Sequence, residues 1–311
     1  MLERTQRILI NEVGPRDGFQ NYSIFIPTET KAKIVSKLIE CGFNKLEITS
    51  FVSQEKVSQM RDAERLIELV QEKADISNTT LCALVPNLKG AERASQCGIN
   101  DISVIISVSE MHNEKNTGMT IKESLNEIRK IREAFPELSM NFSVCTSFGC
   151  HFQGKIQKED VVALINKLIE IRPDIITISD TVGHANPCQV DEMVTLLKKE
   201  FPETRIGLHF HDAFGMGLTN VLVAINRGFY EFDSSLGGMG GCPFSPGAMG
   251  NIVTEDLVMM LKTMGIECNT DIEKLKAAVK LLKESVQFPL KSHVADYFYS
   301  DNEYLVSRMR I

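Results

Sequence analysis

The feature that most constrains the fold is a regular alternation of short apolar runs with longer amphipathic runs. Eight short runs have the apolar or alternating composition that is typical of β-strands. The expected strands cover residues 8–13, 45–49, 80–84, 101–107, 139–146, 175–179, 205–211 and 231–235. Helical patterns, with apolar residues three and four positions apart, separate them over residues 28–41, 60–73, 120–135, 158–171, 187–201 and 217–227.

Eight strands that are each followed by a helical segment predict a fold of the α/β class, namely a single (β/α)8 TIM barrel. A length of 311 residues would also allow two ordinary domains. A doubly wound open sheet is disfavoured because no Gly-x-Gly-x-x-Gly follows the first strand. We therefore expect one catalytic domain over residues 1–311, with the barrel at about 8–265 and a helical extension at about 266–311.

Composition excludes several classes of function. The net charge is -7 and there is no block of five like charges, so we expect no nucleic-acid partner. No run of 18 apolar residues is present, so we expect no membrane span. Residues 1–7 resemble neither a signal peptide nor a transit peptide, which favours a cytoplasmic location. The eight cysteines form no Cys-x-x-Cys pair, which favours reduced thiols.

The strongest chemical signal is His209-Phe210-His211 near the end of the seventh expected strand. Side chains alternate along a strand, so both imidazoles should project from the same face. The carboxyl ends of barrel strands are where such folds hold their chemistry. We interpret the pair as ligands of a divalent cation, against the simpler alternative of one buried and one exposed structural histidine.

Other polar residues follow the carboxyl ends of other strands. They are Arg16 and Asp17 after the first strand, Glu47 on the second, Asp180 after the sixth, and Cys242 and Asn251 after the eighth. A carboxylate, two imidazoles and an amide oxygen favour Mg²⁺ or Mn²⁺ over the cysteine-rich sets of structural zinc. Residues 236–251 contain six glycines and two prolines, which is typical of a mobile or strained loop and places it as a candidate active-site lid.

Each of these residues also has a structural explanation. Arg16 and Asp17 form a surface ion pair in that alternative, Glu47 pairs with a neighbour, Cys242 is inert, and Asp180 supports a loop. Three further histidines in or near expected loops are weaker candidates for the site, namely His112, His151 and His184. His293 lies in the C-terminal segment, where we expect a structural or exposed side chain.

Five segments in the same order resemble the 3-hydroxy-3-methylglutaryl-CoA lyase family of barrel metallolyases, over about residues 8–285. The segments are residues 12–21, 46–53, 86–90, 209–212 and 237–251. The resemblance implies cleavage of hydroxymethylglutaryl-CoA into acetoacetate and acetyl-CoA, with Mg²⁺ or Mn²⁺ required. It also implies a small-molecule acyl-CoA substrate, a place in leucine degradation and a homo-oligomer, which we expect to be a dimer.

The same resemblance implies the roles of individual residues. Four of them would hold the metal: Asp17, His209, His211 and Asn251. Asp17 and His209 also count among the catalytic residues, with Arg16 facing the thioester oxygen, Glu47 beside the metal and Cys242 exchanging a proton. The residues expected to bind substrate are Arg16, Gln20, Asp180 and Gly241.

Departures from the family pattern leave alternatives for the substrate open. Residues 22–23 read Tyr-Ser, residues 151–154 read His-Phe-Gln-Gly, and Met249 stands where a small residue is usual. The first alternative is a lyase for a longer 3-hydroxy-3-alkylglutaryl-CoA. The second is a condensing synthase that resembles the isopropylmalate and homocitrate synthases. Those enzymes usually carry Glu-Gln where this chain has Phe19-Gln20, and an acidic residue in the glycine loop.

Overall fold

The computed structural model describes residues 7–241, 250–295 and 298. Eight parallel strands close into a barrel in sequence order, and β1 pairs with β8. The strands are β1 (Leu9–Glu12), β2 (Lys45–Ser50), β3 (Thr80–Leu84), β4 (Asp101–Ser107), β5 (Ser139–Cys145), β6 (Ile175–Asp180), β7 (Ile206–Phe210) and β8 (Glu231–Ser234). The predicted (β/α)8 fold is therefore confirmed.

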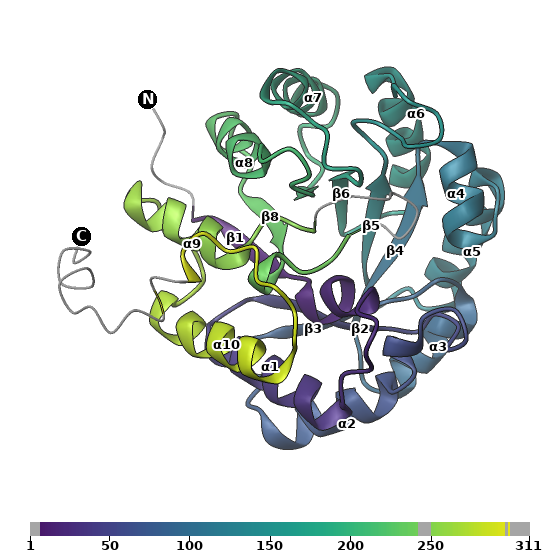
Figure 1. Ribbon diagram of the computed structural model, residues 1–311. Coiled ribbons are helices and arrows are strands. Elements are labelled where there is room, and N and C mark those ends of the chain that lie inside the picture. Colours follow the sequence, from purple (N-terminus) through teal and green to yellow (C-terminus); the bar gives the residue numbers. More distant parts are fainter. Residues whose placement is uncertain (1–6, 242–249, 296–297, 299–311) are drawn as a thin grey trace.

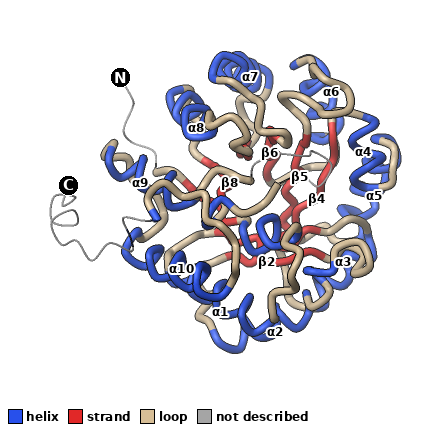
Figure 2. Tube along the Cα trace, viewed as in Figure 1, coloured by secondary structure: helices blue, strands red, loops and turns tan. Residues whose placement is uncertain are grey.

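Helices surround the strands on the outside, as Figures 1 and 2 show. They are α1 (Thr28–Glu40), α2 (Ala63–Lys73), α3 (Leu88–Gln96), α4 (Glu110–Thr117), α5 (Ile121–Ala134), α6 (Lys158–Ile169), α7 (Pro187–Glu200), α8 (Gly217–Asn226), α9 (Thr254–Thr263) and α10 (Ile272–Ser285). Short turns lie at η1 (Gly14–Gly18), η2 (Ser58–Met60) and η3 (Leu236–Gly238). Among the described helices, none combines the length and the apolar character that crossing a bilayer requires.

Sequence signals explain where several helices begin and end. The side chains of Thr120 and Asn186 cap the first turns of α5 and α7 in complete capping boxes, and Pro187 opens α7. Helix α4, which periodicity did not predict, begins after the Ser109 cap and ends at Gly118 in the left-handed conformation. Its apolar face is weak, so its caps specify it more strongly than its pattern does.

The apolar core lies between the sheet and the helices. Outward-facing residues of the strands, such as Ile102, Phe142 and Leu208, are fully buried. They belong to one continuous apolar cluster with helix residues such as Val35 and Val190. Each such side chain contributes on the order of 1.5–3 kcal/mol when it leaves water, so this outer layer supplies most of the hydrophobic stabilisation.

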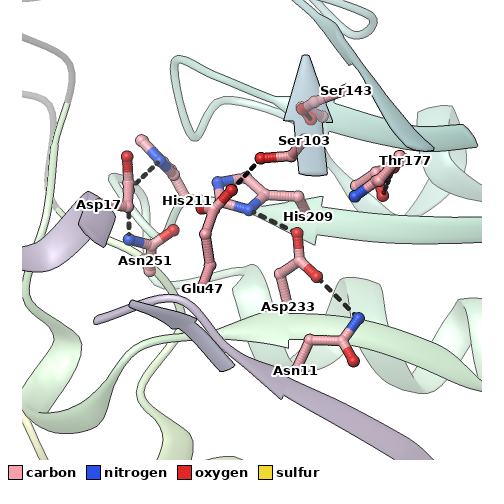
Figure 3. Close-up of polar contacts among 12 residues, drawn as sticks. Asn11, Asp17, Glu47, Ser103, Ser143, Thr177, His209, His211, Asp233 and Asn251 are labelled. Carbon is pink, nitrogen blue, oxygen red and sulfur yellow. Dashed lines mark hydrogen bonds and ion pairs between the residues drawn. The ribbon is translucent and has the colours of Figure 1, made fainter. Parts of the chain in front are cut away.

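The barrel interior, in contrast, is lined mainly by polar side chains. Inward-facing side chains form hydrogen bonds with one another across neighbouring strands: Thr177 donates to Asn141, and Ser143 contacts Ser179. Lys45 forms an ion pair of 2.6 Å with Asp101. TIM barrels usually fill this space with layers of branched apolar residues. Here several separate groups of hydrogen-bonded polar side chains occupy the interior, and some of their members are drawn in Figure 3.

Candidate active site

Arg16 and Asp17 lie on η1, a single π-helical turn that follows β1. The amide of Phe19 donates to the carbonyl of Gly14, five residues earlier, which closes the turn. The side chains of Arg16 and Asp17 are almost completely buried. Such turns are rare in proteins, and those that occur are often found at functional sites. No helix was expected here, because a five-residue turn rich in glycine and proline carries no helical period.

Asp17, His209 and His211 converge at the carboxyl ends of β1 and β7. Each residue offers one potential ligand atom, and these atoms all lie within 4.8 Å of one another. The two imidazole centroids are 5.1 Å apart, and Nε2 of His211 lies 3.8 Å from Oδ2 of Asp17. The expected strand over 205–211 ends one residue earlier, at Phe210, and His211 forms an isolated bridge with Asn251.

The Asn251 side chain completes this group. Its amide nitrogen donates to Oδ2 of Asp17 at 2.7 Å and to the carbonyl of Met239 at 3.0 Å. Its Oδ1 is buried and has no hydrogen-bond partner among the described residues, and the same holds for Nδ1 of His211. Buried polar atoms normally have partners. An unpaired amide oxygen beside a carboxylate and two imidazoles is therefore a donor set that fits a divalent cation.

The electrostatics of the group also suit a cation. Burial works against ionisation of Asp17, but Arg16, His211 and His209 outweigh it and hold the pKa of this carboxyl below its ordinary value. Burial, followed by the neighbouring His209, lowers the pKa of His211 to about 4. The site thus presents an ionised carboxylate and a neutral imidazole near pH 7, which are the forms that bind metals.

Arg16 bridges two carboxylates beside this group. Its guanidinium contacts Glu47 at 2.5 Å and Asp17 at 2.6 Å. Burial disfavours the charged form of Arg16, but these two carboxylates more than compensate and raise its pKa. Glu47 also accepts a hydrogen bond from Ser103 (Figure 3). The guanidinium is therefore held rigidly, with its charge fixed at all relevant pH values.

The remaining predicted site residues are distributed as follows. Gln20 donates to Oδ1 of Asp17 at 2.8 Å, so it lies beside the group. The carbonyl of Gly241 accepts a hydrogen bond from Asn21. Asp180 is buried, and its carboxylate accepts the backbone N–H groups of residues 183–185, so it supports the loop after β6. Burial raises its pKa to about 6 against these three donors. Cys242 lies outside the described residues.

Two buried glutamates anchor the segments that carry the site. Glu12 accepts the amides of Gly14 and Leu236 and the hydroxyl of Thr254, at 2.6–2.9 Å. Glu255 accepts the amide of Gly237 at 3.1 Å. Burial raises the pKa of Glu12 to about 7 and that of Glu255 to about 8. These contacts join η1, η3 and the start of α9, and so fix the base of the glycine-rich loop.

Gly240 explains part of the glycine content of this loop. It adopts a φ of +114°, in the region that favours glycine. A Cβ there would overlap the Asn251 amide nitrogen and lie 3.0 Å from Oδ2 of Asp17. Any other residue would therefore push a side chain into the group that Asp17, His209, His211 and Asn251 form.

The sequence-based predictions missed Asp233. Its Oδ2 lies 3.2 Å from Nδ1 of His209, and its Oδ1 accepts a hydrogen bond from Asn11 at 3.2 Å (Figure 3). Burial lowers the pKa of His209, but Asp233 and Asp17 outweigh burial and raise it. The signal was available, because Glu231 and Asp233 alternate with apolar residues on the strand that follows the two histidines.

A closed parallel barrel with these side chains at the carboxyl ends of its strands defines a barrel enzyme with a set of residues fit to hold a cation. A model of the HMGL-like family matches residues 7–282, so the chain belongs to that family. The resemblance that the sequence motifs predicted is thereby confirmed.

Named relatives and solved structures agree with the family. Hydroxymethylglutaryl-CoA lyase YngG of Bacillus subtilis is 38% identical over 297 residues, which cover 95% of this chain and 98% of the relative. The mitochondrial hydroxymethylglutaryl-CoA lyase of Mus musculus is 35% identical over 93% of this chain and 89% of the relative. The structure of an HMG-CoA lyase from Acinetobacter baumannii in complex with coenzyme A and 3-methylmalate is 37% identical, with a TM-score of 0.88 over 93% of this chain and 94% of that chain.

Proposed function

We propose that the protein is a divalent-metal-dependent carbon–carbon lyase that cleaves 3-hydroxy-3-methylglutaryl-CoA into acetoacetate and acetyl-CoA. The observation that carries the proposal is the rigid Arg16 guanidinium beside the Asp17, His209 and His211 group. Relatives of the same family that span nearly the whole chain are named for this reaction. The acyl-CoA substrate is supported by the related structure that contains coenzyme A.

The reaction is a retro-Claisen cleavage. The C3 hydroxyl loses its proton, the bond between C2 and C3 breaks, and C3 becomes the ketone of acetoacetate. The electron pair passes to C2, and its charge is shared with the thioester oxygen. A proton delivered to C2 completes acetyl-CoA. The residues therefore have three tasks: to orient the hydroxyl, to stabilise the enolate and to move one proton.

We assign these tasks to named side chains. Asp17, His209, His211 and Asn251 would hold Mg²⁺ or Mn²⁺, which supplies a Lewis acid that lowers the pKa of a bound alcohol. Arg16 faces the thioester oxygen, where a fixed charge is commonly worth about 3–4 kcal/mol. Glu47 holds Arg16 in place. Cys242 carries the transferred proton, and Gln20, Asp180 and Gly241 contact the substrate.

We infer that residues 1–311 form one catalytic domain, with a helical extension from about residue 266. We further propose a cytoplasmic homodimer that serves leucine degradation. α10 packs against α1 on the outside of the barrel, which supports the view that the extension is part of the same domain.

One assay tests the function directly. The purified protein is incubated with hydroxymethylglutaryl-CoA and Mg²⁺ or Mn²⁺, and acetoacetate is measured with an NADH-linked reductase. We expect acetoacetate that disappears after treatment with a chelator and returns with metal. Cleavage of only a longer 3-hydroxy-3-alkylglutaryl-CoA would change the substrate. Release of free CoA from acetyl-CoA and a 2-oxo acid, without cleavage, would contradict the lyase assignment.

Replacing Cys242 with Ser should lower kcat by about 10²- to 10⁴-fold, the range for loss of a general acid or base. The hydroxyl keeps the size of the side chain but has a far higher pKa than the thiol. Circular dichroism and Mn²⁺ binding should remain those of the parent protein. Cys188→Ser is the matched control, because this exposed thiol lies on α7, away from the site. A normal kcat for Cys242→Ser would remove the thiol from the mechanism.

A further inference from the structure

Asp233 is placed beside His209 by the register of the barrel. His209 on β7 pairs with Asp233 on β8, and Asp233 pairs in turn with Asn11 on β1. The three residues therefore lie beside one another on consecutive strands. His209 and Asp233 are largely buried, with side chains 11% and 12% exposed, so their contact is shielded from water.

Both carboxylate oxygens of Asp233 are engaged. Oδ2 faces Nδ1 of His209, and Oδ1 accepts a hydrogen bond from Asn11. An ionised carboxylate can only accept hydrogen bonds, so Nδ1 of His209 must carry the proton. The neutral ring then presents the lone pair of Nε2 toward Asp17 and His211, where the potential ligand atoms gather.

A chain of polar contacts connects Asp233 to the amino end of β7. The Asn11 amide nitrogen also donates to Glu231 at 3.1 Å, and Glu231 accepts from Nε of Arg205 at 2.8 Å. Arg205 is half exposed at the amino end of β7. The contacts thus run from a half-exposed guanidinium, through the polar interior, to one imidazole of the site. His211 differs, because its Nδ1 has no partner in the described part of the chain.

We propose that Asp233 is a positioning residue that fixes the tautomer and ring orientation of His209, and that Asn11 holds Asp233 in place for this purpose. Asp233 is not itself one of the three residues whose ligand atoms converge. Carboxylates that accept from a metal-binding histidine commonly contribute 10- to 100-fold to metal affinity. The inference rests on the metal site of the proposed function and adds a residue that orients one of its ligands.

The test measures Mn²⁺ affinity from the electron paramagnetic resonance signal of the free ion. We expect Asp233→Ala to raise the Kd for Mn²⁺ by about 10- to 100-fold. Asp233→Asn keeps an acceptor oxygen, so it should raise the Kd by less. Activity of Asp233→Ala should recover at saturating Mn²⁺, because the residue acts through His209 and not on the substrate. Asp101→Asn is the matched control, since this buried carboxylate pairs with Lys45 and does not contact His209.

The outcomes separate this inference from the proposed function. If the parent protein binds no Mn²⁺, the metal site itself is wrong. If the parent protein binds and Asp233→Ala has the same Kd within twofold, only the role of Asp233 is overturned. Thermal unfolding shows whether each variant is folded. Should Asp233→Ala not fold, Asp233→Asn and Asn11→Ala carry the test, and parental affinity in both contradicts the proposal.

Discussion

Arg16→Gln should lower kcat/KM for hydroxymethylglutaryl-CoA by about 10²- to 10³-fold, which corresponds to roughly 3–4 kcal/mol of lost transition-state stabilisation. Gln keeps a hydrogen-bond donor, on a shorter side chain, but removes the positive charge that meets the developing enolate. The loss should fall mainly on kcat, because this charge interacts more strongly with the enolate than with the neutral thioester. Steady-state kinetics at saturating Mn²⁺ measures it.

Removing this guanidinium also leaves Glu47 and Asp17 without their positively charged partner, so stability must be measured alongside activity. Arg132→Gln is the matched control. Its guanidinium is equally buried, with a side chain 9% exposed against 11% for Arg16, and it pairs with Asp174 away from the site. The control should lower the unfolding temperature without a comparable loss of kcat. Parental kinetics for Arg16→Gln would show that the enolate is stabilised elsewhere.

Asp17→Ala should abolish Mn²⁺ binding in the micromolar range and reduce activity to the background rate. The carboxylate is the only anion among the four proposed ligands, so its loss removes the main electrostatic attraction for a dication. It also removes the acceptor for the amides of Gln20 and Asn251. Isothermal titration with Mn²⁺ gives the affinity, and the acetoacetate assay gives the rate.

Asp62→Ala serves as the comparison for Asp17→Ala. Asp62 is also a largely buried carboxylate in a short ion pair, 2.8 Å from Lys31, but it lies outside the site at the start of α2. This variant should lose stability and keep its affinity for Mn²⁺. If Asp17→Ala still bound the ion with parental affinity, the convergence of Asp17, His209 and His211 would have no role in metal binding.

The sequence predicted the strands well because their pattern is local. Each strand alternates buried apolar residues with inward polar ones, and turn residues bound it, so its existence follows from a short window. The strand order of a barrel then places Asp17, which follows β1, and His209, which lies on β7, on either side of β8, where the ring closes. For this reason the convergence of Asp17 with the two histidines could be predicted from the chain alone, while the roles of these residues stay proposals.

The features that the sequence did not predict depend on contacts between distant segments. The bridge between His211 and Asn251, and the contact of Asp233 with His209, require the register of the closed barrel. Asp180 looked equally suited to a site or to a loop. The structure shows that its carboxylate accepts hydrogen bonds from three backbone amides, as a loop-supporting residue would. A contact between Asp180 and the substrate stays a prediction.

In this barrel, the residues that stabilise the fold and the residues that form the candidate site lie on opposite faces of the sheet. Hydrophobic stabilisation resides in the layer outside the sheet, where Phe142 and Leu208 pack against the helices. Exchanging an inward polar residue such as Asn141 therefore removes little buried apolar area, provided that its hydrogen-bond partners are matched. Scaffolds of this kind can acquire new substrate preferences through successive interior exchanges at a small thermodynamic penalty, which makes this chain a suitable starting point for directed evolution of related carbon–carbon cleavages.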